Sequence, residues 1–321
     1  MRRLTAVFAA TAVACTLPAP TPAEAATGDP VAAVRRLLSA RLTAKVAEMG
    51  DVQLGSRSRL INHTANTFQY DFDRAGSIQL GRTGVLASDL SRRLRFKRDD
   101  SAALVKKDAA EGDAVARSLL IQTRPHRSVS VNGRLYTTGS LYAPALPKGK
   151  TWALRGGIPN GGAFTDQVVN VFEPQTLKTL LSDTYFKKRS GFKDSNGRIH
   201  ENTMLYKGKI TFADLYAVSP TFRALLGQKP DATLAPALVW WWLWTDKDGT
   251  PMMVDSIWDT WVKGGADRPH ARGAARTEYL AWRPRVTIKP PSSSLVAKVE
   301  GPAGGLPEID DVGEALRDRR G

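Results

Sequence analysis

One short segment of the chain is apolar without interruption. The stretch 238–244 has the sequence Leu-Val-Trp-Trp-Trp-Leu-Trp. Successive side chains of a β-strand point to opposite faces of a sheet, so this stretch predicts a strand that is apolar on both faces. The turn-forming residues 246–249 follow it and predict a hairpin in which Thr245 pairs with Thr250. The fold must therefore cover both faces of this strand or leave an aromatic row exposed.

The predicted hairpin assigns a face to each side chain. Pairing Thr245 with Thr250 places Trp240 opposite Asp255, and that charge predicts a wetter face formed by Trp240, Trp242 and Trp244. The inward residues are then Val239, Trp241, Leu243, Met252 and Val254. Two interpretations remain: an ordinary core with a covered sheet, or an inner apolar cavity with an exposed aromatic contact surface.

Helical spacing of apolar residues marks three further segments. Residues 29–46 predict a helix capped by Asp29 with Pro30 at its first position, and residues 173–183 predict another that begins behind Pro174. Residues 211–226 predict a third helix, which Pro220 splits into two pieces.

Alternating patterns and turn dipeptides predict strands elsewhere. Residues 68–72 and 128–131 alternate apolar and polar side chains, and Asn132-Gly133 and Asn196-Gly197 are strong signals for two-residue hairpins. Residues 278–288 resume strand character after the grouped helices. This order predicts an α+β fold in which helices pack on one face of a large curved sheet.

The N-terminus contains the three parts of a secretion leader in order. Arg2 and Arg3 form a positive start, residues 4–14 are uncharged and mostly apolar, and Ala23-Glu24-Ala25 matches a small-x-small cleavage site. The apolar run is too short to span a bilayer, which needs roughly 20 apolar residues. We therefore expect residues 1–25 to be a leader that directs the protein out of the cytoplasm.

Cys15 allows a second interpretation of the same leader. Residues 12–15, Ala-Val-Ala-Cys, resemble a lipobox, in which the cysteine is acylated and begins the mature chain. Acylation would anchor the protein on the outer face of the cytoplasmic membrane, whereas cleavage after Ala25 would secrete it. Cys15 is also the single cysteine, so the fold has no intrachain disulfide and depends on its core.

The rest of the chain predicts one domain and a tail. Residues 26–298 are long enough for a single domain that buries about 75% of its unfolded surface. Residues 299–321 are rich in Gly and Pro and then charged, which indicates a flexible tail.

The chain is strongly basic, with a formal charge of +15 and a pI near 10.1. Export excludes nucleic acid, so the expected anionic partners are membrane headgroups or wall polymers. A simpler alternative is that the charges only keep a tryptophan-rich protein soluble. The residues expected to contact an anionic surface are Arg92, Arg93, Arg95, Lys187 and Lys188.

Residues with catalytic or metal-binding chemistry do not cluster in the sequence. It contains no G-x-S-x-G motif and no phosphate-binding loop. The four histidines, at positions 63, 126, 200 and 270, lie singly, and the acidic turns lack the last acidic residue of a calcium loop. We therefore expect no enzyme activity, no cofactor and no metal.

Several of these segments together resemble one family. Residues 243–251 match a W-x-D-x-x-G-x-P hairpin, and residues 132–136 followed by Trp152 match a hairpin and tryptophan strand. Residues 206–226 match a strand-then-helix passage, and 279–291 match a last strand with a Pro-Pro exit. This order resembles the LppX/LprG-type envelope lipoproteins, whose fold is shared with the LolA-like lipoprotein carriers.

The resemblance implies a fold and a function. The fold would be a half-open antiparallel β-barrel wrapped around a few helices, and the function would be carriage of a lipid or another acylated molecule in an apolar cavity. The alternative is a non-enzymatic envelope sensor or adaptor that binds a protein partner through the tryptophan-rich sheet face. The residues expected to line the cavity are Trp241, Leu243, Met252, Val254, Leu177, Leu181, Phe212, Leu215 and Phe222.

Overall fold

The computed structural model describes residues 28–56, 68–97, 99–111, 122–139, 146–155, 167–260, 269–283 and 286–299, with isolated positions at 116, 119–120 and 143. The predicted leader with Cys15, and nearly all of the predicted tail, lie outside the described residues.

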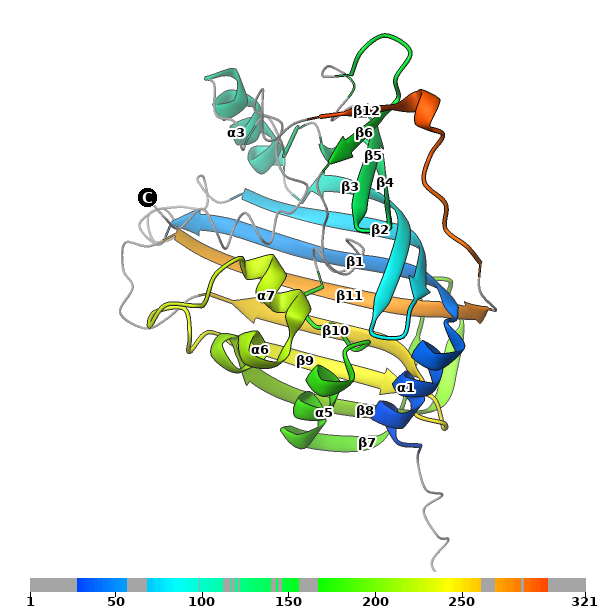
Figure 1. Ribbon diagram of the computed structural model, residues 1–321. Coiled ribbons are helices and arrows are strands. Elements are labelled where there is room, and N and C mark those ends of the chain that lie inside the picture. Colours follow the sequence, from blue (N-terminus) through cyan, green and yellow to red (C-terminus); the bar gives the residue numbers. More distant parts are fainter. Residues whose placement is uncertain are drawn as a thin grey trace, which may run out of the picture.

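One large sheet of 12 strands organises the molecule (Figure 1). Its order is β12-β6-β5-β4-β3-β2-β1-β11-β10-β9-β8-β7, and every neighbouring pair is antiparallel except β12 with β6. The strands are β1 (Thr43–Ser56), β2 (Phe68–Leu80), β3 (Val85–Phe96), β4 (His126–Val131), β5 (Arg134–Gly139), β6 (Trp152–Arg155), β7 (Thr184–Lys193), β8 (Ile199–Thr211), β9 (Leu238–Thr245), β10 (Pro251–Asp259), β11 (Pro269–Arg283) and β12 (Val296–Lys298).

Helices pack on one face of this sheet, which confirms the predicted α+β class. The described helices are α1 (Pro30–Ala40), α3 (Asp99–Ala110), α5 (Pro174–Ser182), α6 (Phe212–Val218) and α7 (Pro220–Leu226), and the 3₁₀ turn η4 is Ser293–Leu295. Figure 1 shows α1, α5, α6 and α7 over the half of the sheet that ends at β7. We call the face under these helices the inner face and the opposite one the outer face. The sheet does not close, because β7 and β12 are its free edges.

Caps and prolines set the ends of the helices. Asp29 accepts a 2.9 Å hydrogen bond from the backbone N–H of Val31, as expected of an N-cap. The prediction that this helix extends to residue 46 was wrong. Arg41 adopts the left-handed conformation (φ 51°), which ends the helix, and from Thr43 the backbone pairs with both β2 and β11.

Helices α5, α6 and α7, which correspond to the two other predicted helices, form one bundle around a buried carboxylate. Glu173 accepts hydrogen bonds from Ser219 Oγ (2.7 Å), Thr176 Oγ1 (2.9 Å) and the backbone N–H of Thr221 (2.9 Å). It therefore ties the start of α5 to the start of α7. Pro220 begins α7, so the predicted split at this proline is confirmed.

The two predicted Asn-Gly turns behave differently. Asn132 and Gly133 both have positive φ, at 54° and 69°, and form the predicted two-residue hairpin between β4 and β5. The prediction of a second such turn was wrong, because five residues, 194–198, join β7 to β8. There the carboxylate of Asp194 accepts hydrogen bonds from the backbone N–H groups of Asn196 and Arg198.

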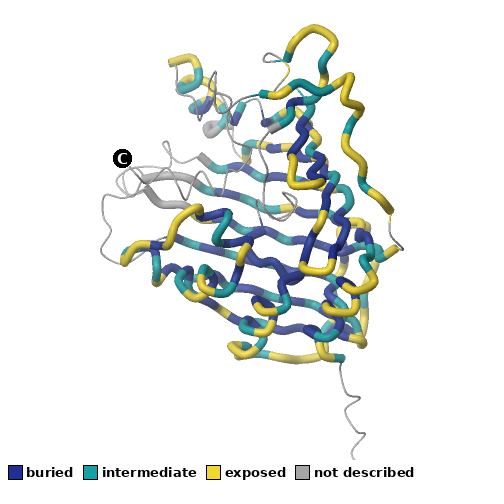
Figure 2. Tube along the Cα trace, in the orientation of Figure 1, coloured by how far each residue is buried: buried dark blue, intermediate teal, exposed yellow. Residues whose placement is uncertain are grey.

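Two apolar clusters share the inner face. The larger lies under α1, α5, α6 and α7, and the smaller packs Tyr70, Phe72 and Leu94 against Val105 of α3. Figure 2 shows the strands of the two clusters as mostly buried, with exposed residues on helices, on loops and on the edge strand β7. Each cluster buries its own set of apolar side chains, so each stabilises its own half of the sheet.

A row of buried polar residues separates the two clusters. Glu48, Arg74 and Arg92 occupy neighbouring positions on β1, β2 and β3, and each is 5% exposed or less. One guanidinium nitrogen of Arg74 lies 2.7 Å from both carboxylate oxygens of Glu48. The same carboxylate accepts a 2.8 Å hydrogen bond from Thr277 Oγ1. Charges buried in this way are stable only when paired and hydrogen bonded.

Replacing Arg74 with Met removes the guanidinium that contacts the Glu48 carboxylate in the core. We expect the free energy of unfolding to fall by about 3–5 kcal/mol, measured by urea denaturation. The double variant Glu48→Gln, Arg74→Met should recover part of this loss, because it removes both charges. A loss below about 1 kcal/mol in the single variant, the size typical of a surface ion pair, would contradict the buried pair.

Candidate functional site

The tryptophan strand β9 alternates as the sequence predicts. Val239, Trp241 and Leu243 are buried on the inner face, whereas Trp240, Trp242 and Trp244 are half-buried on the outer face. Neighbouring strands extend both faces, because β8 and β10 pair with β9 on its two sides. The outer tryptophans therefore form a continuous row in the middle of one half of the sheet.

The predicted pairing of the β9–β10 hairpin was wrong by one residue at Thr245 and by two residues beyond the irregularity. Thr245 pairs with Pro251, and an irregularity between Pro251 and Met253 leaves Met252 outside the ladder. Val254 consequently opposes Leu243, and Asp255 opposes Trp242 instead of Trp240. A shift of two residues keeps each side chain on its face, since the period of a strand is two.

Most residues predicted to line a cavity lie together on the inner face. Met252 is the exception: as the bulge residue it is half-exposed and lies outside the apolar cluster, so its prediction was wrong. Leu181 packs against the margin of the cluster. The members inside it, all 1% exposed or less, are Trp241, Leu243, Val254, Leu177, Phe212, Leu215 and Phe222. Helix and sheet side chains thus contact one another directly in this region.

The inner tryptophans pack against glycines on adjacent strands. Gly208 of β8 pairs with Trp241, and Gly273 of β11 pairs with Trp258. A Cβ atom at Gly208 would lie 2.2 Å from the Trp241 ring, and one at Gly273 would lie 2.5 Å from the Trp258 ring. Each indole therefore lies flat over the backbone of the neighbouring strand, which a larger residue would prevent.

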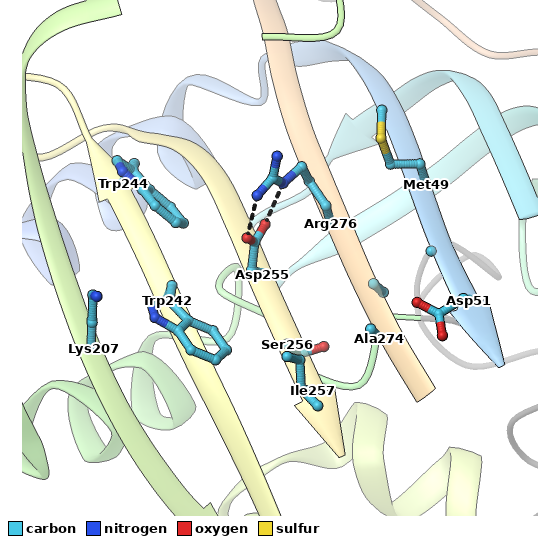
Figure 3. Close-up of a pocket in the computed structure, with 12 residues that line it drawn as sticks. Met49, Asp51, Lys207, Trp242, Trp244, Asp255, Ser256, Ile257, Ala274 and Arg276 are labelled. Atoms are coloured by element: carbon cyan, nitrogen blue, oxygen red, sulfur yellow. Dashed lines mark hydrogen bonds and ion pairs between the residues drawn. The ribbon is translucent and has the colours of Figure 1, made fainter. Parts of the chain in front are cut away.

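A groove of about 430 Å³ opens on the outer face beside the tryptophan row (Figure 3). Its floor consists of small residues, and Trp242 and Trp244 lie on one side of it with Met49 and Asp51 on the other. The full lining is Met49, Gly50, Asp51, Lys207, Trp242, Trp244, Asp255, Ser256, Ile257, Ala274, Ala275 and Arg276. We call this site the outer groove.

An ion pair between neighbouring strands lines the outer groove. The guanidinium of Arg276 contacts both carboxylate oxygens of Asp255, at 2.9 and 2.8 Å. These hydrogen bonds hold the pKa of Arg276 above its ordinary value, and burial only partly opposes the shift. Sequence reasoning missed Arg276 and Met49, because no local pattern shows that β11 pairs with β10 and that β1 pairs with β11.

The loop between β7 and β8 covers one end of the tryptophan row. Ser195 donates from its backbone N–H (2.9 Å) and its hydroxyl (2.6 Å) to Glu278 of β11. The ring of Phe192 lies between those of His200 and Trp244, at centroid distances of 4.8 and 6.1 Å. Burial acts to raise the pKa of Asp194, but hydrogen bonds from His200 and from the loop backbone lower it below its ordinary value. These contacts hold the loop against the outer face.

The basic residues predicted to meet an anionic surface have different surroundings. Arg92 is 4% exposed and donates a 2.5 Å hydrogen bond to Gln122, so its prediction as a surface contact was wrong. Its alternation with Arg93 and Arg95, which are exposed, places it on the inner face. Lys187 and Lys188 are exposed on the edge strand β7.

Among the described residues, no group of three His, Cys, Asp or Glu side chains is arranged to hold a metal ion. No helix in the described part of the chain is long and apolar enough to cross a membrane. His200 bonds to Asp194 and stacks on Phe192, and His63 lies outside the described residues.

Comparisons with known proteins give structural likenesses but no family. No family model matches the chain, and no curated protein matches it. The crystal structure of a DUF1329 family protein from Desulfovibrio piger aligns with 81% of this chain and 95% of its own, at 9% identity and a TM-score of 0.22.

Replacing Gly208 with Ala tests the packing that orients β9. The added Cβ would meet the Trp241 ring, so we expect the free energy of unfolding to fall by about 2 kcal/mol, as for other overpacked cores. In a Trp241→Leu background, measured by the same urea titration, the glycine change should cost less than about 1 kcal/mol. Equal costs in the two backgrounds would contradict the placement of the indole over Gly208.

Proposed function

We propose that this chain is a non-enzymatic binding protein of the cell envelope, and that the outer face around the tryptophan row holds its partner. One observation carries the proposal: Trp240, Trp242 and Trp244 are half-buried on a face that no described helix covers over β7–β11. Contiguous aromatic surface of this kind marks contact sites in soluble proteins.

A contrast within the same face supports this proposal. At the β3–β6 end, the outer apolar residues Val129 and Tyr136 pack against Ile288 and Val296 from the C-terminal part of the chain. The described chain supplies no such cover over the row at Trp240 and Trp242. A partner that covered these tryptophans would remove aromatic surface from water, and each Å² removed would stabilise the complex by about 25 cal/mol.

The outer groove gives that surface the features of a binding site. Its volume of about 430 Å³ lies within the range of ligand sites, roughly 300–1,000 Å³. The paired Asp255 and Arg276 offer fixed polar groups beside the indoles of Trp242 and Trp244 (Figure 3). The indoles would supply apolar contact to a ligand, and the ion pair would orient its polar groups.

Carriage of a lipid on the inner face is a second candidate, and a specific observation favours it. The indole N–H groups of Trp241 and Trp258 are buried and have no hydrogen-bond acceptor among the described residues. An ester carbonyl of an acyl lipid that entered the apolar cluster would accept from them. The resemblance to envelope lipid carriers supports the same candidate, and the packed state of the cluster would require the helices to move.

The test uses the chain from residue 26 onward, which contains every residue that the structure describes. We expect it to sediment with isolated cell envelopes, and the variant Trp242→Ser, Trp244→Ser to bind at least about tenfold more weakly, since central aromatic anchors dominate binding energy. Trp152→Ser, at a half-buried tryptophan on β6, is the matched control and should bind normally.

Equal loss in the Trp152 control would point to unfolding, and unchanged binding of the double variant would overturn the proposal. The second candidate has a separate readout. Native mass spectrometry of protein purified from its own envelope should reveal a bound acyl lipid if the inner face is a carrier site, and only ligand-free protein if it is not.

A further inference from the structure

Three lysines on the outer face of β7 and β8 have no carboxylate partner among the described residues. These are Lys188, Lys207 and Lys209, and we call them the lysine edge. Two cations elsewhere on the same face are paired: Arg95 with Asp73 at 2.6 Å, and Arg276 with Asp255 at 2.8 Å. The positive charge of the lysine edge is therefore uncompensated within the part of the fold that the structure describes.

One aromatic ring orients two of the ammonium groups of the lysine edge. The Nζ atoms of Lys207 and Lys188 lie over the ring of Phe186, at 4.8 and 5.5 Å from its centroid. A cation–π contact of this kind orients a cation without neutralising it. Lys188 and Lys207 are thus oriented near the aromatic surface, while their charge stays available to an external anion.

The tryptophan row continues the lysine edge across the next strand. Lys207 pairs with Trp242 and Lys209 pairs with Trp240, so each of these two lysine side chains has an indole as its cross-strand neighbour. Tryptophan is enriched at membrane–water interfaces, where its ring sits at headgroup level, and lysine stems extend toward the phosphates. The tryptophans therefore suit the headgroup level of a bilayer surface, and the lysines suit its phosphate groups.

We infer that the lysine edge and the tryptophan row dock on an anionic lipid bilayer. The inference rests on the proposed function and names the partner of that face. A protein partner is a poorer match, because lysine is depleted at protein interfaces where arginine is enriched, and the uncompensated cations here are lysines. On the other side of the outer groove, Asp51 adds negative charge to the same face, and the neighbouring Asp71 is paired with Lys97 at 3.7 Å. The contact is therefore confined to β7–β9.

The test uses vesicles of phosphatidylcholine alone and vesicles that also contain phosphatidylglycerol, with the unlipidated chain from residue 26 onward. We expect binding only to the anionic vesicles, and weaker binding at high salt, because salt shortens the Debye length. Replacing Lys188, Lys207 and Lys209 with Gln should weaken partitioning by about fivefold per lysine, or roughly a hundredfold in total.

A matched control separates position from net charge. The variant Lys148→Gln, Lys229→Gln, Lys289→Gln removes the same charge from exposed positions outside β7–β9 and should partition within about twofold of the parent chain. Equal losses in the two triple variants would overturn the inference, because they would show a general charge effect. Circular dichroism of each variant confirms that it folds.

The outcomes distinguish this inference from the proposed function. Binding to envelopes through the tryptophans, without binding to anionic vesicles, would overturn the bilayer as partner and leave the proposed function standing. Displacement from envelopes by inorganic polyphosphate, with no vesicle binding, would identify an anionic wall polymer instead. Absence of binding to both envelopes and vesicles would overturn both proposals.

Discussion

The packing of the Trp241 indole on Gly208 is the contact on which the rest of this account depends. It holds Trp241 on the inner face, and the period of two along a strand then places Trp240, Trp242 and Trp244 outside. A slip of one residue would bury three indoles under the helices and expose the residues that now form the core. One glycine–tryptophan pair thus separates the residues that stabilise the fold from those proposed to bind a partner.

The two faces of the sheet differ in what covers them. On the inner face, helices and sheet form two apolar clusters that are divided by the Glu48–Arg74 pair and its neighbours. On the outer face, the C-terminal segment covers one end, and the loop at Ser195 covers the tip of the tryptophan row. The remaining surface carries the outer groove, the tryptophans and the lysine edge. Because this surface consists of strands rather than loops, its side chains are held in fixed positions before any partner arrives.

Local patterns in the sequence predicted much of the fold but little of the groove. The faces of β9, the turn at Asn132-Gly133 and the break at Pro220 follow from strand alternation, positive φ and the ring of proline. The bulge at Met252 depends on pairing with β9, and the burial of Arg92 depends on its contacts with Gln122 and with the neighbouring strands, which no local pattern encodes. The outer groove joins β1 to β11 across more than half of the chain, so only the folded sheet brings its residues together.

The measurement that tests the central claim most directly asks which face of the sheet meets the envelope. Since Cys15 in the predicted leader is the single cysteine, the chain from residue 26 accepts one solvatochromic label at an engineered cysteine. Lys209→Cys reports from the lysine edge, and Lys178→Cys reports from the exposed side of α5. We expect a blue shift at position 209 and none at 178 when envelopes are added. A shift at 178 alone would contradict this expectation and would assign the contact to the helices.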